Sequence, residues 1–115
     1  DWVMWMDADA SIIDHSVDLR FVISHIPQDK LLAVSADIWP THGSGACNTG
    51  VMLVRGGDRA KESMALLEEW WQTANTDNKD IARYKQDHPG EQAVLNIELW
   101  PKHSNKIHRL PFCWL

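Results

Sequence analysis

The sequence predicts an α/β protein whose mostly parallel sheet is flanked by helices. Short runs of consecutive apolar residues, as at residues 2–6 and 31–36, are typical of strands that are covered on both faces of a sheet. Segments with apolar residues at helical spacing lie between such runs. Because strands and helices alternate along the chain, a layered α/β sheet is favoured. The 115 residues, 44% of them hydrophobic, fit one domain with its own core.

Four strands are expected. Each is a run of mainly apolar residues bounded by polar, Gly or Pro residues. They cover residues 2–6, 31–36, 48–55 and 107–110. The first runs directly into Asp7-Ala8-Asp9, and a loop rich in Gly, Ser and His is expected after the second, at residues 37–47.

Three helices are expected between the strands. The first covers about residues 16–26 and is stopped by Pro27. The second follows Gly56-Gly57, with Asp58 as its N-cap. Its predicted buried stripe is Ala60, Met64, Leu67, Trp71 and Ala74. The third opens at residues 89–91, and its predicted buried side is Ala93, Val94, Ile97 and Trp100.

The charge of the chain limits its partners. It carries 11 basic and 16 acidic residues, so its formal net charge is −5 at pH 7. Nucleic-acid binding usually rests on a basic face, so nucleic acid is not an expected partner. An acidic protein that binds an anionic diphosphate needs a cation between the two.

We interpret residues 1–115 as one partial domain of a longer protein. The chain does not begin with Met, and it opens inside a predicted core strand. No apolar run approaches the roughly 18 residues that cross a bilayer, and no signal peptide is visible. A membrane anchor that is missing from this segment therefore says nothing about the parent protein. Cys47 and Cys113 match no zinc pattern and are interpreted as buried thiols, with one disulfide as the alternative.

Asp7 and Asp9 form the strongest candidate site. An Asp-x-Asp pair is expected about once by chance at this composition, so its position carries the argument. In α/β sheets, ligands bind beyond the carboxyl ends of strands, and this pair directly follows the first predicted strand. In an extended chain the two carboxylates would leave on the same side and bind a hard cation such as Mn²⁺ or Mg²⁺. The alternative is that both residues cap a turn.

Three segments, in this order, resemble a known enzyme family. They are WVMWMDADA at residues 2–10, NTGVMLVR at 48–55 and EQAVLN at 91–96. Together they resemble the retaining glycosyltransferases of fungi that transfer α-galactosyl or α-mannosyl groups, and the xyloglucan xylosyltransferases of plants. The resemblance implies a GT-A fold, a UDP- or GDP-sugar donor, a glycan acceptor and Mn²⁺ or Mg²⁺ as cofactor. It also implies a single-pass type II membrane protein of the Golgi, with the nucleotide-binding part of the domain before residue 1.

The resemblance implies substrate and metal roles for four residues. Asp7 would contact the donor ribose or the metal, and Asp9 would bind the metal directly. Asn48 and Gly50 would lie beside the donor or acceptor sugar. Gly50 suits that place because a backbone without a side chain can approach a sugar closely. Both residues are also common turn residues that could simply open a strand.

By the same resemblance, Glu91 and Gln92 are the catalytic candidates, because they would approach the reacting face of the sugar ring. A carboxylate or an amide oxygen there would stabilise an oxocarbenium-like transition state. The alternative is an ordinary first helical turn, where acidic residues are favoured. Trp39, in the predicted loop with His42, is an expected substrate-binding residue because sugars stack on aromatic rings; packing is its alternative role.

Two other functions stay open. Phosphohydrolases of the haloacid-dehalogenase type also end an apolar strand with Asp-x-Asp, where the first Asp is the nucleophile. Gly57-Asp58 with Glu62 is similar to their later acidic motif, although Ala10 stands where that family has Gly-Thr. The third possibility is a carbohydrate-binding relic that has lost catalysis, and an isolated partial domain need not be active.

Overall fold

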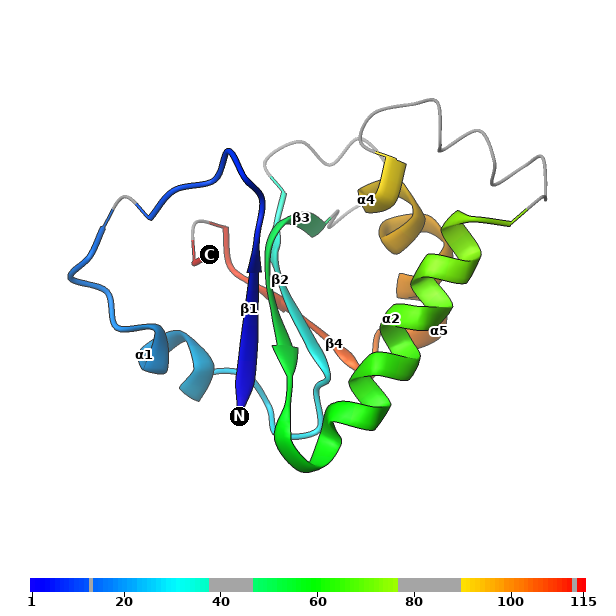
Figure 1. Cartoon of the computed structure of the whole chain (residues 1–115). Helices are drawn as coiled ribbons and strands as arrows, with labels where there is room; N and C mark the ends of the chain where they lie inside the picture. Colours follow the sequence, from blue (N-terminus) through cyan, green and yellow to red (C-terminus); the bar gives the residue numbers. More distant parts are fainter. Residues whose placement is uncertain (13, 38–46, 77–89, 113) are drawn as a thin grey trace.

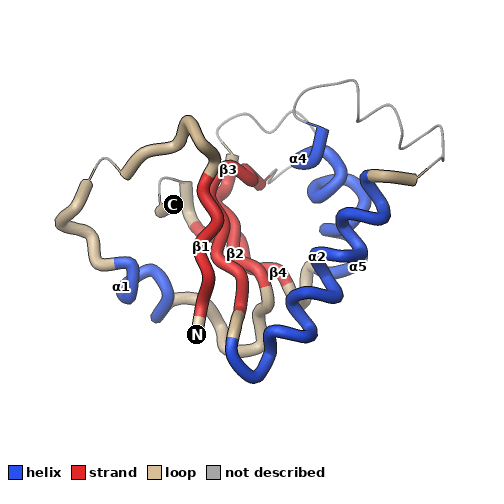
Figure 2. Tube along the Cα trace, viewed as in Figure 1, coloured by secondary structure: helices blue, strands red, loops and turns tan. Residues whose placement is uncertain are grey.

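The structure is a computed structural model that describes residues 1–12, 14–37, 47–76, 90–112 and 114–115. Its strands are β1 (Trp2–Met6), β2 (Leu32–Ala36), β3 (Cys47–Arg55) and β4 (Ile107–Leu110). Its α-helices are α1 (Leu19–Ser24), α2 (Ala60–Ala74), α4 (Gly90–Val94) and α5 (Trp100–His103). They form three layers, with α1 on one side of the sheet and α2, α4 and α5 on the other (Figures 1 and 2). The expected α/β class is confirmed.

The strand directions differ from the prediction. The sheet has the order β1-β3-β2-β4, and β3 runs antiparallel to both of its neighbours, whereas β2 and β4 are parallel. The sheet is therefore mixed, and the expected mostly parallel arrangement is wrong. A run of apolar residues reports that a strand is buried but carries no information about its direction, which depends on the connections.

Strand β1 is less covered than its apolar sequence suggests. It lies at the edge of the sheet and pairs only with β3 among the described strands. Val3 is 63% and Trp5 57% exposed, and Met4 and Met6 are exposed as well. The prediction that β1 is covered on both faces is wrong for the described chain, whereas β2 is buried throughout Leu32–Ser35.

Two cores flank the sheet. On the side of α2 and α4, the sheet residues Leu32 and Val34 pack with buried residues that include Leu66, Trp70 and Leu99. On the side of α1, the buried cluster is Val22, Ile26, Ala33, Leu53 and Leu110. Helix α1 begins after Asp18, whose carboxylate accepts a hydrogen bond from the N–H of Arg20 at 2.9 Å. No helix among the described residues is long and apolar enough to cross a membrane.

Helix α2 buries a different stripe from the predicted one. Its buried residues are Ser63, Leu66 and Trp70, while Met64 is 60% and Trp71 65% exposed. Trp71 is therefore not a core residue. Leu67 and Ala74 of the predicted stripe do pack against the core. Adjacent residues point about 100° apart around a helix, so Trp70 and Trp71 belong to different stripes, and the sheet buries the stripe that includes Trp70.

The start of α2 also differs from the prediction. Gly57 has a positive φ of 63° and opens a short 3₁₀ turn, η1 (Gly57–Arg59), ahead of the helix. Asp58 lies inside this turn and is not the N-cap; the helix starts after Arg59 without a side-chain cap bond. The left-handed Gly57 changes the chain direction one residue before Asp58.

The third predicted helix is present in three parts. Between α4 and α5 the chain forms a π-helical segment, η3 (Leu95–Leu99). Ala93 and Val94 are buried as expected, and Ile97 and Trp100 are partly buried against the core. Leu95 and Leu99 are buried as well. The wider π turn shifts the buried side, so a regular 3.6-residue period does not locate these two leucines.

Candidate functional site

The end of β1 meets the start of β3. In their antiparallel pairing Met6 faces Val51, and the N–H of Asp7 donates to the carbonyl of Gly50 at 2.8 Å. The N–H of Gly50 in turn donates to Oδ1 of Asn48 at 2.9 Å. A Cβ at position 50 would lie 3.1 Å from Asn48 Oδ1 and 3.3 Å from Asp7 Oδ2. Asp7, Asn48 and Gly50, predicted from two distant segments, are therefore neighbours, and glycine is what permits their approach.

Asp7 and Asp9 are not in an extended chain. Strand β1 ends at Met6, Ala8 and Asp9 form a turn, and the N–H of Ala10 donates to the carbonyl of Asp7 at 3.1 Å. The expectation that alternation along a strand aligns the two carboxylates is therefore wrong. The turn still keeps both residues exposed at the strand end. Asp7 Oδ1 accepts a hydrogen bond from Trp5 Nε1 at 3.3 Å.

The residues of α4 reach the same part of β3. Gln92 Oε1 accepts from the N–H of Thr49 at 3.1 Å, and Gln92 Nε2 donates to Asp37 Oδ2 at 2.7 Å. The hydroxyl of Thr49 donates to Glu91 Oε1 at 3.3 Å. Both ends of the Gln92 amide are thus bound to protein, whereas Glu91 is exposed.

Asn96 is a contributor that the sequence did not reveal as such. One helical turn beyond Gln92, its Oδ1 accepts from the N–H of Cys47 at 2.6 Å, and its Nδ2 donates to the carbonyl of Cys47 at 2.9 Å. The side-chain amide thus satisfies the backbone of β3 as a neighbouring strand would. The spacing of Gln92 and Asn96 at i and i+4 was a signal that both face the same element.

The side chain of Cys47 is buried. Burial raises its pKa to about 11, because the charged thiolate loses hydration there. A raised pKa favours the protonated thiol, which is a poor nucleophile, and the choice between a thiol and a disulfide stays a prediction. Cys113 lies outside the described residues, and so do the expected substrate-binding residue Trp39 and its neighbour His42.

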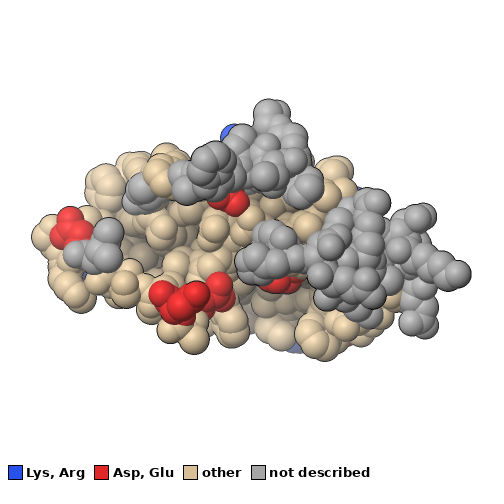
Figure 3. Space-filling model, turned by 90° about the horizontal axis from the view of Figure 1, so that it is seen from above, with Lys and Arg blue, Asp and Glu red and all other residues tan. Residues whose placement is uncertain are grey.

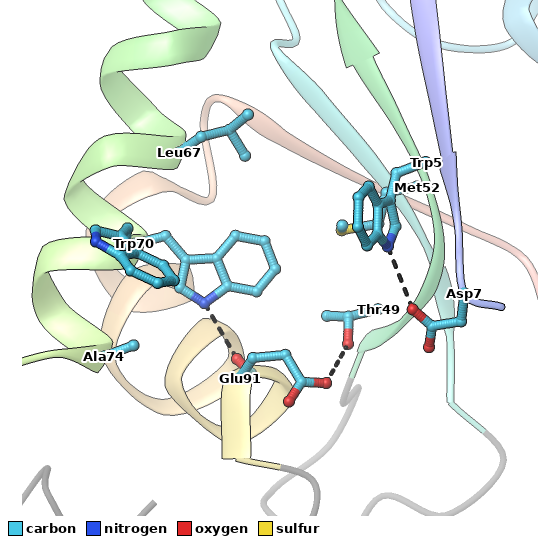
Figure 4. Close-up of a pocket in the computed structure, with 9 residues that line it drawn as sticks. Trp5, Asp7, Thr49, Met52, Leu67, Trp70, Ala74 and Glu91 are labelled. Atoms are coloured by element: carbon cyan, nitrogen blue, oxygen red, sulfur yellow. Dashed lines mark hydrogen bonds between the residues drawn. The ribbon is translucent and has the colours of Figure 1, made fainter. Parts of the chain in front are cut away.

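A pocket of about 410 Å³ lies between this part of the sheet and α2. Trp5 and Trp70 stand on opposite sides of it, and Thr49, Asp7 and Glu91 gather at one end (Figure 4). Trp70 is held in place by a hydrogen bond from its Nε1 to the carbonyl of Glu91 at 3.1 Å. The pocket thus contains one of the predicted metal ligands and one of the predicted catalytic residues.

The described residues fit a divalent cation only in part. No group of three or more His, Cys, Asp or Glu side chains suited to a metal is present among them. Asp7 and Asp9 offer two exposed carboxylates, which matches the way Mg²⁺ is bound by one or two carboxylates together with substrate phosphates and water. His103, a residue type that often binds metals, contacts Glu69 through Nε2 at 2.9 Å. The residues present therefore suit a metal that arrives with a phosphorylated substrate.

The charge around the site is acidic. Figure 3 looks down on the edge where β1 ends, and among the described residues it shows patches of acidic surface with very little basic surface. A phosphorylated ligand at this edge would meet repulsion unless a cation were bound with it.

No family model matches the chain, and no curated protein is significantly similar in sequence. Among solved structures, the chain is similar to the crystal structure of a glycosyltransferase involved in the glycosylation of the major capsid of PBCV-1. The TM-score is 0.60 at 17% sequence identity, and the match covers 96% of this chain and 48% of that one. The chain therefore has the fold of about half of that glycosyltransferase.

Proposed function

We propose that this chain is part of a metal-dependent glycosyltransferase that moves a hexosyl or xylosyl group from a nucleotide diphosphate sugar to a glycan acceptor, with retention. One observation carries the proposal. Asp7, Gly50 and Glu91 come from three segments far apart in the sequence, and contacts through Asn48 and Thr49 bring them to one edge of the sheet. The likeness of the fold to a solved glycosyltransferase supports it.

In the proposed reaction, the bond between the anomeric carbon and the diphosphate oxygen breaks, and its electron pair leaves with the diphosphate. The acceptor hydroxyl oxygen bonds to the anomeric carbon, and its proton passes to the departing phosphate oxygen. Bound Mn²⁺ or Mg²⁺, held by Asp7 and Asp9, would neutralise the charge of the diphosphate. Asn48 and Gly50 would line the place of the sugar beside Asp7.

We assign different tasks to the two catalytic candidates. The carboxylate of Glu91 is exposed and lines the pocket, so it is the group placed to stabilise positive charge on the sugar ring. Both ends of the Gln92 side-chain amide form hydrogen bonds within the protein, to Thr49 and to Asp37. It therefore acts as a positioning residue that holds α4 against β3 in this arrangement.

The rival phosphohydrolase is disfavoured by the position of its second acidic motif. Gly56 donates to the carbonyl of Asp1 at 2.9 Å, and the Cβ position of Gly57 lies 3.4 Å from Asp1 Oδ2. Asp58, next to Gly57, therefore lies near the N-terminal end of β1, whereas Asp7 comes directly after its C-terminal end. At about 3.3 Å per residue these ends are roughly 20 Å apart, too far for both acids to bind one metal.

The decisive experiment uses the purified parent protein with UDP- and GDP-sugars and Mn²⁺. Without acceptor, it should slowly release nucleotide diphosphate and free sugar and leave simple phosphomonoesters intact. Asp9→Ala should abolish this activity, and excess chelator should do the same. Full activity in excess chelator would refute the role of the metal. Trapping of a phosphorylated Asp7 would refute the transferase and support the phosphohydrolase.

Location is proposed on the family resemblance alone. The parent protein would be a single-pass type II membrane protein of the Golgi. Protease protection of the catalytic domain in isolated Golgi vesicles, lost on adding detergent, is the expected result. Digestion of the domain in intact vesicles would contradict this location.

A further inference from the structure

The pocket between β1, β3 and α2 has two aromatic walls whose polar edges are already occupied. The indole N–H of Trp5 donates to Asp7 at 3.3 Å, and that of Trp70 donates to the carbonyl of Glu91 at 3.1 Å. These bonds fix both rings and leave their apolar atoms toward the pocket (Figure 4). Trp5 is 57% exposed, so a ligand can reach its ring without unfolding the protein.

The polar groups of the pocket lie at one end and are of one kind. Asp7 and Glu91 present carboxylate oxygens, and Thr49 lies between them with its hydroxyl bound to Glu91. The nine described residues that line the pocket include no Lys or Arg. An anion such as a diphosphate is therefore excluded from its interior, and a neutral ligand with several hydroxyl donors fits the carboxylates.

We propose that this pocket is the acceptor subsite and binds one neutral pyranose ring between Trp5 and Trp70, with hydroxyls donating to Asp7 and Glu91. The inference rests on the proposed function. Sugar C–H groups carry partial positive charge and pack on the negative face of an aromatic ring. A volume of about 410 Å³ lies in the range of about 300–1,000 Å³ that small-molecule pockets occupy. The donor diphosphate stays outside, with Asp9 at the strand end.

Binding is tested with defined probes in the ¹⁵N-labelled protein. The probes are methyl α-D-mannopyranoside and methyl β-D-galactopyranoside, compared with sorbitol, which has hydroxyls but no ring, and cyclohexanol, which has a ring but one hydroxyl. We expect at least one glycoside to shift the indole N–H signals of Trp5 and Trp70 saturably, and neither control to do so. Absence of shifts with both glycosides would overturn the proposal, and equal shifts with cyclohexanol would show a merely apolar pocket.

Variants at one wall separate ring stacking from other contacts. Trp5→Leu should weaken glycoside binding about tenfold, whereas Trp5→Phe, which keeps an aromatic face but loses the N–H, should restore most of it. Met64→Ala is the matched control, because Met64 is 60% exposed on α2 and does not line the pocket. Equal losses in the Leu and Phe variants would contradict stacking on the Trp5 ring.

Donor hydrolysis by the purified parent protein tests the proposed function separately. Hydrolysis of a nucleotide sugar without glycoside binding would refute the acceptor subsite and leave the transferase standing. Glycoside binding without any donor hydrolysis would refute both the transferase and the acceptor role, and the pocket would then belong to a carbohydrate-binding relic.

Discussion

Gln92 accepts a hydrogen bond from the backbone N–H of Thr49 at 3.1 Å, which joins α4 to β3 across 43 positions of sequence. Four residues further along, Asn96 makes the same kind of contact with Cys47. Two side-chain amides thus replace a strand neighbour along the first part of β3. This attachment sets the distance between Glu91, on the helix, and Asp7, beside the strand, and so determines the size of the proposed site.

Replacing the two neighbours Glu91 and Gln92 should give different losses. Glu91→Gln keeps an oxygen that can accept from Thr49 but removes the charge, so kcat should fall at least tenfold with little change in thermal stability. Gln92→Ala leaves the Thr49 N–H without its partner and should cost about 1–3 kcal/mol of unfolding free energy as well as activity. Steady-state kinetics and urea unfolding of both variants measure this. A Gln92→Ala protein of wild-type stability would refute its positioning role.

Adding a methyl group at Gly50 should damage the site more than the fold. The Cβ of Gly50→Ala would lie 3.1 Å from Asn48 Oδ1 and 3.3 Å from Asp7 Oδ2, so both side chains must move. We expect donor hydrolysis to fall at least tenfold. Gly56→Ala is the control, because its Cβ would meet only Asp1, at an ordinary 3.7 Å. Equal activity of the two variants would show that the spacing around Gly50 is unimportant.

Two adjacent Trp residues on α2 should differ sharply in their effect on stability. Trp70 is 8% exposed and hydrogen-bonded, so Trp70→Ala should cost about 3–5 kcal/mol of unfolding free energy. Trp71 is 65% exposed, and Trp71→Ala should stay within about 0.5 kcal/mol of wild type. Urea unfolding checks both values. Similar costs for the two would restore Trp71 as a core residue.

The contrast between Trp70 and Trp71 shows how far the sequence could lead. Runs of apolar residues located the four strands of the described residues, because burial between layers leaves a strong local pattern. The pattern could not decide between two stripes that differ by one position, since that choice depends on the sheet that the helix meets. For the same reason the edge position of β1 and the direction of β3 were not predicted.

The residues of the candidate site that belong to short sequence motifs could be predicted. Those that are defined only by contacts in the fold could not. Asp7, Asn48 and Gly50 were named from short motifs, and the structure makes them neighbours. The contacts of Asn96 and the aromatic pocket depend on which residues the fold brings together over long distances in sequence. The i, i+4 spacing of Gln92 and Asn96 indicates that they share a helix face but not which element that face contacts. Their functional roles remain predictions for the experiments above.

The last prediction concerns the response of the fold to acid. Burial, helped by the charge of Lys30, lowers the pKa of His108 below its ordinary value of 6.5. In the unfolded chain His108 therefore takes up its proton at a higher pH than in the fold, so the unfolded state binds more protons between these two values. The free energy of unfolding is therefore unaffected by His108 above about pH 6.5. It decreases as the pH falls below this value, until His108 is protonated in the folded protein as well.

Urea unfolding between pH 7.5 and 5 measures this loss. The Glu69 carboxyl, whose pKa is lowered by the hydrogen bond from His103, keeps its stabilising contribution above its ordinary value of 4.5 and loses it mainly at lower pH, below this window. His108→Gln should flatten the decline of the unfolding midpoint, because the half-buried titrating group is gone. His15→Gln is the control, since His15 is an exposed histidine outside both cores, and it should keep the wild-type decline. A decline that His108→Gln leaves unchanged would mean that another group takes up the proton on unfolding.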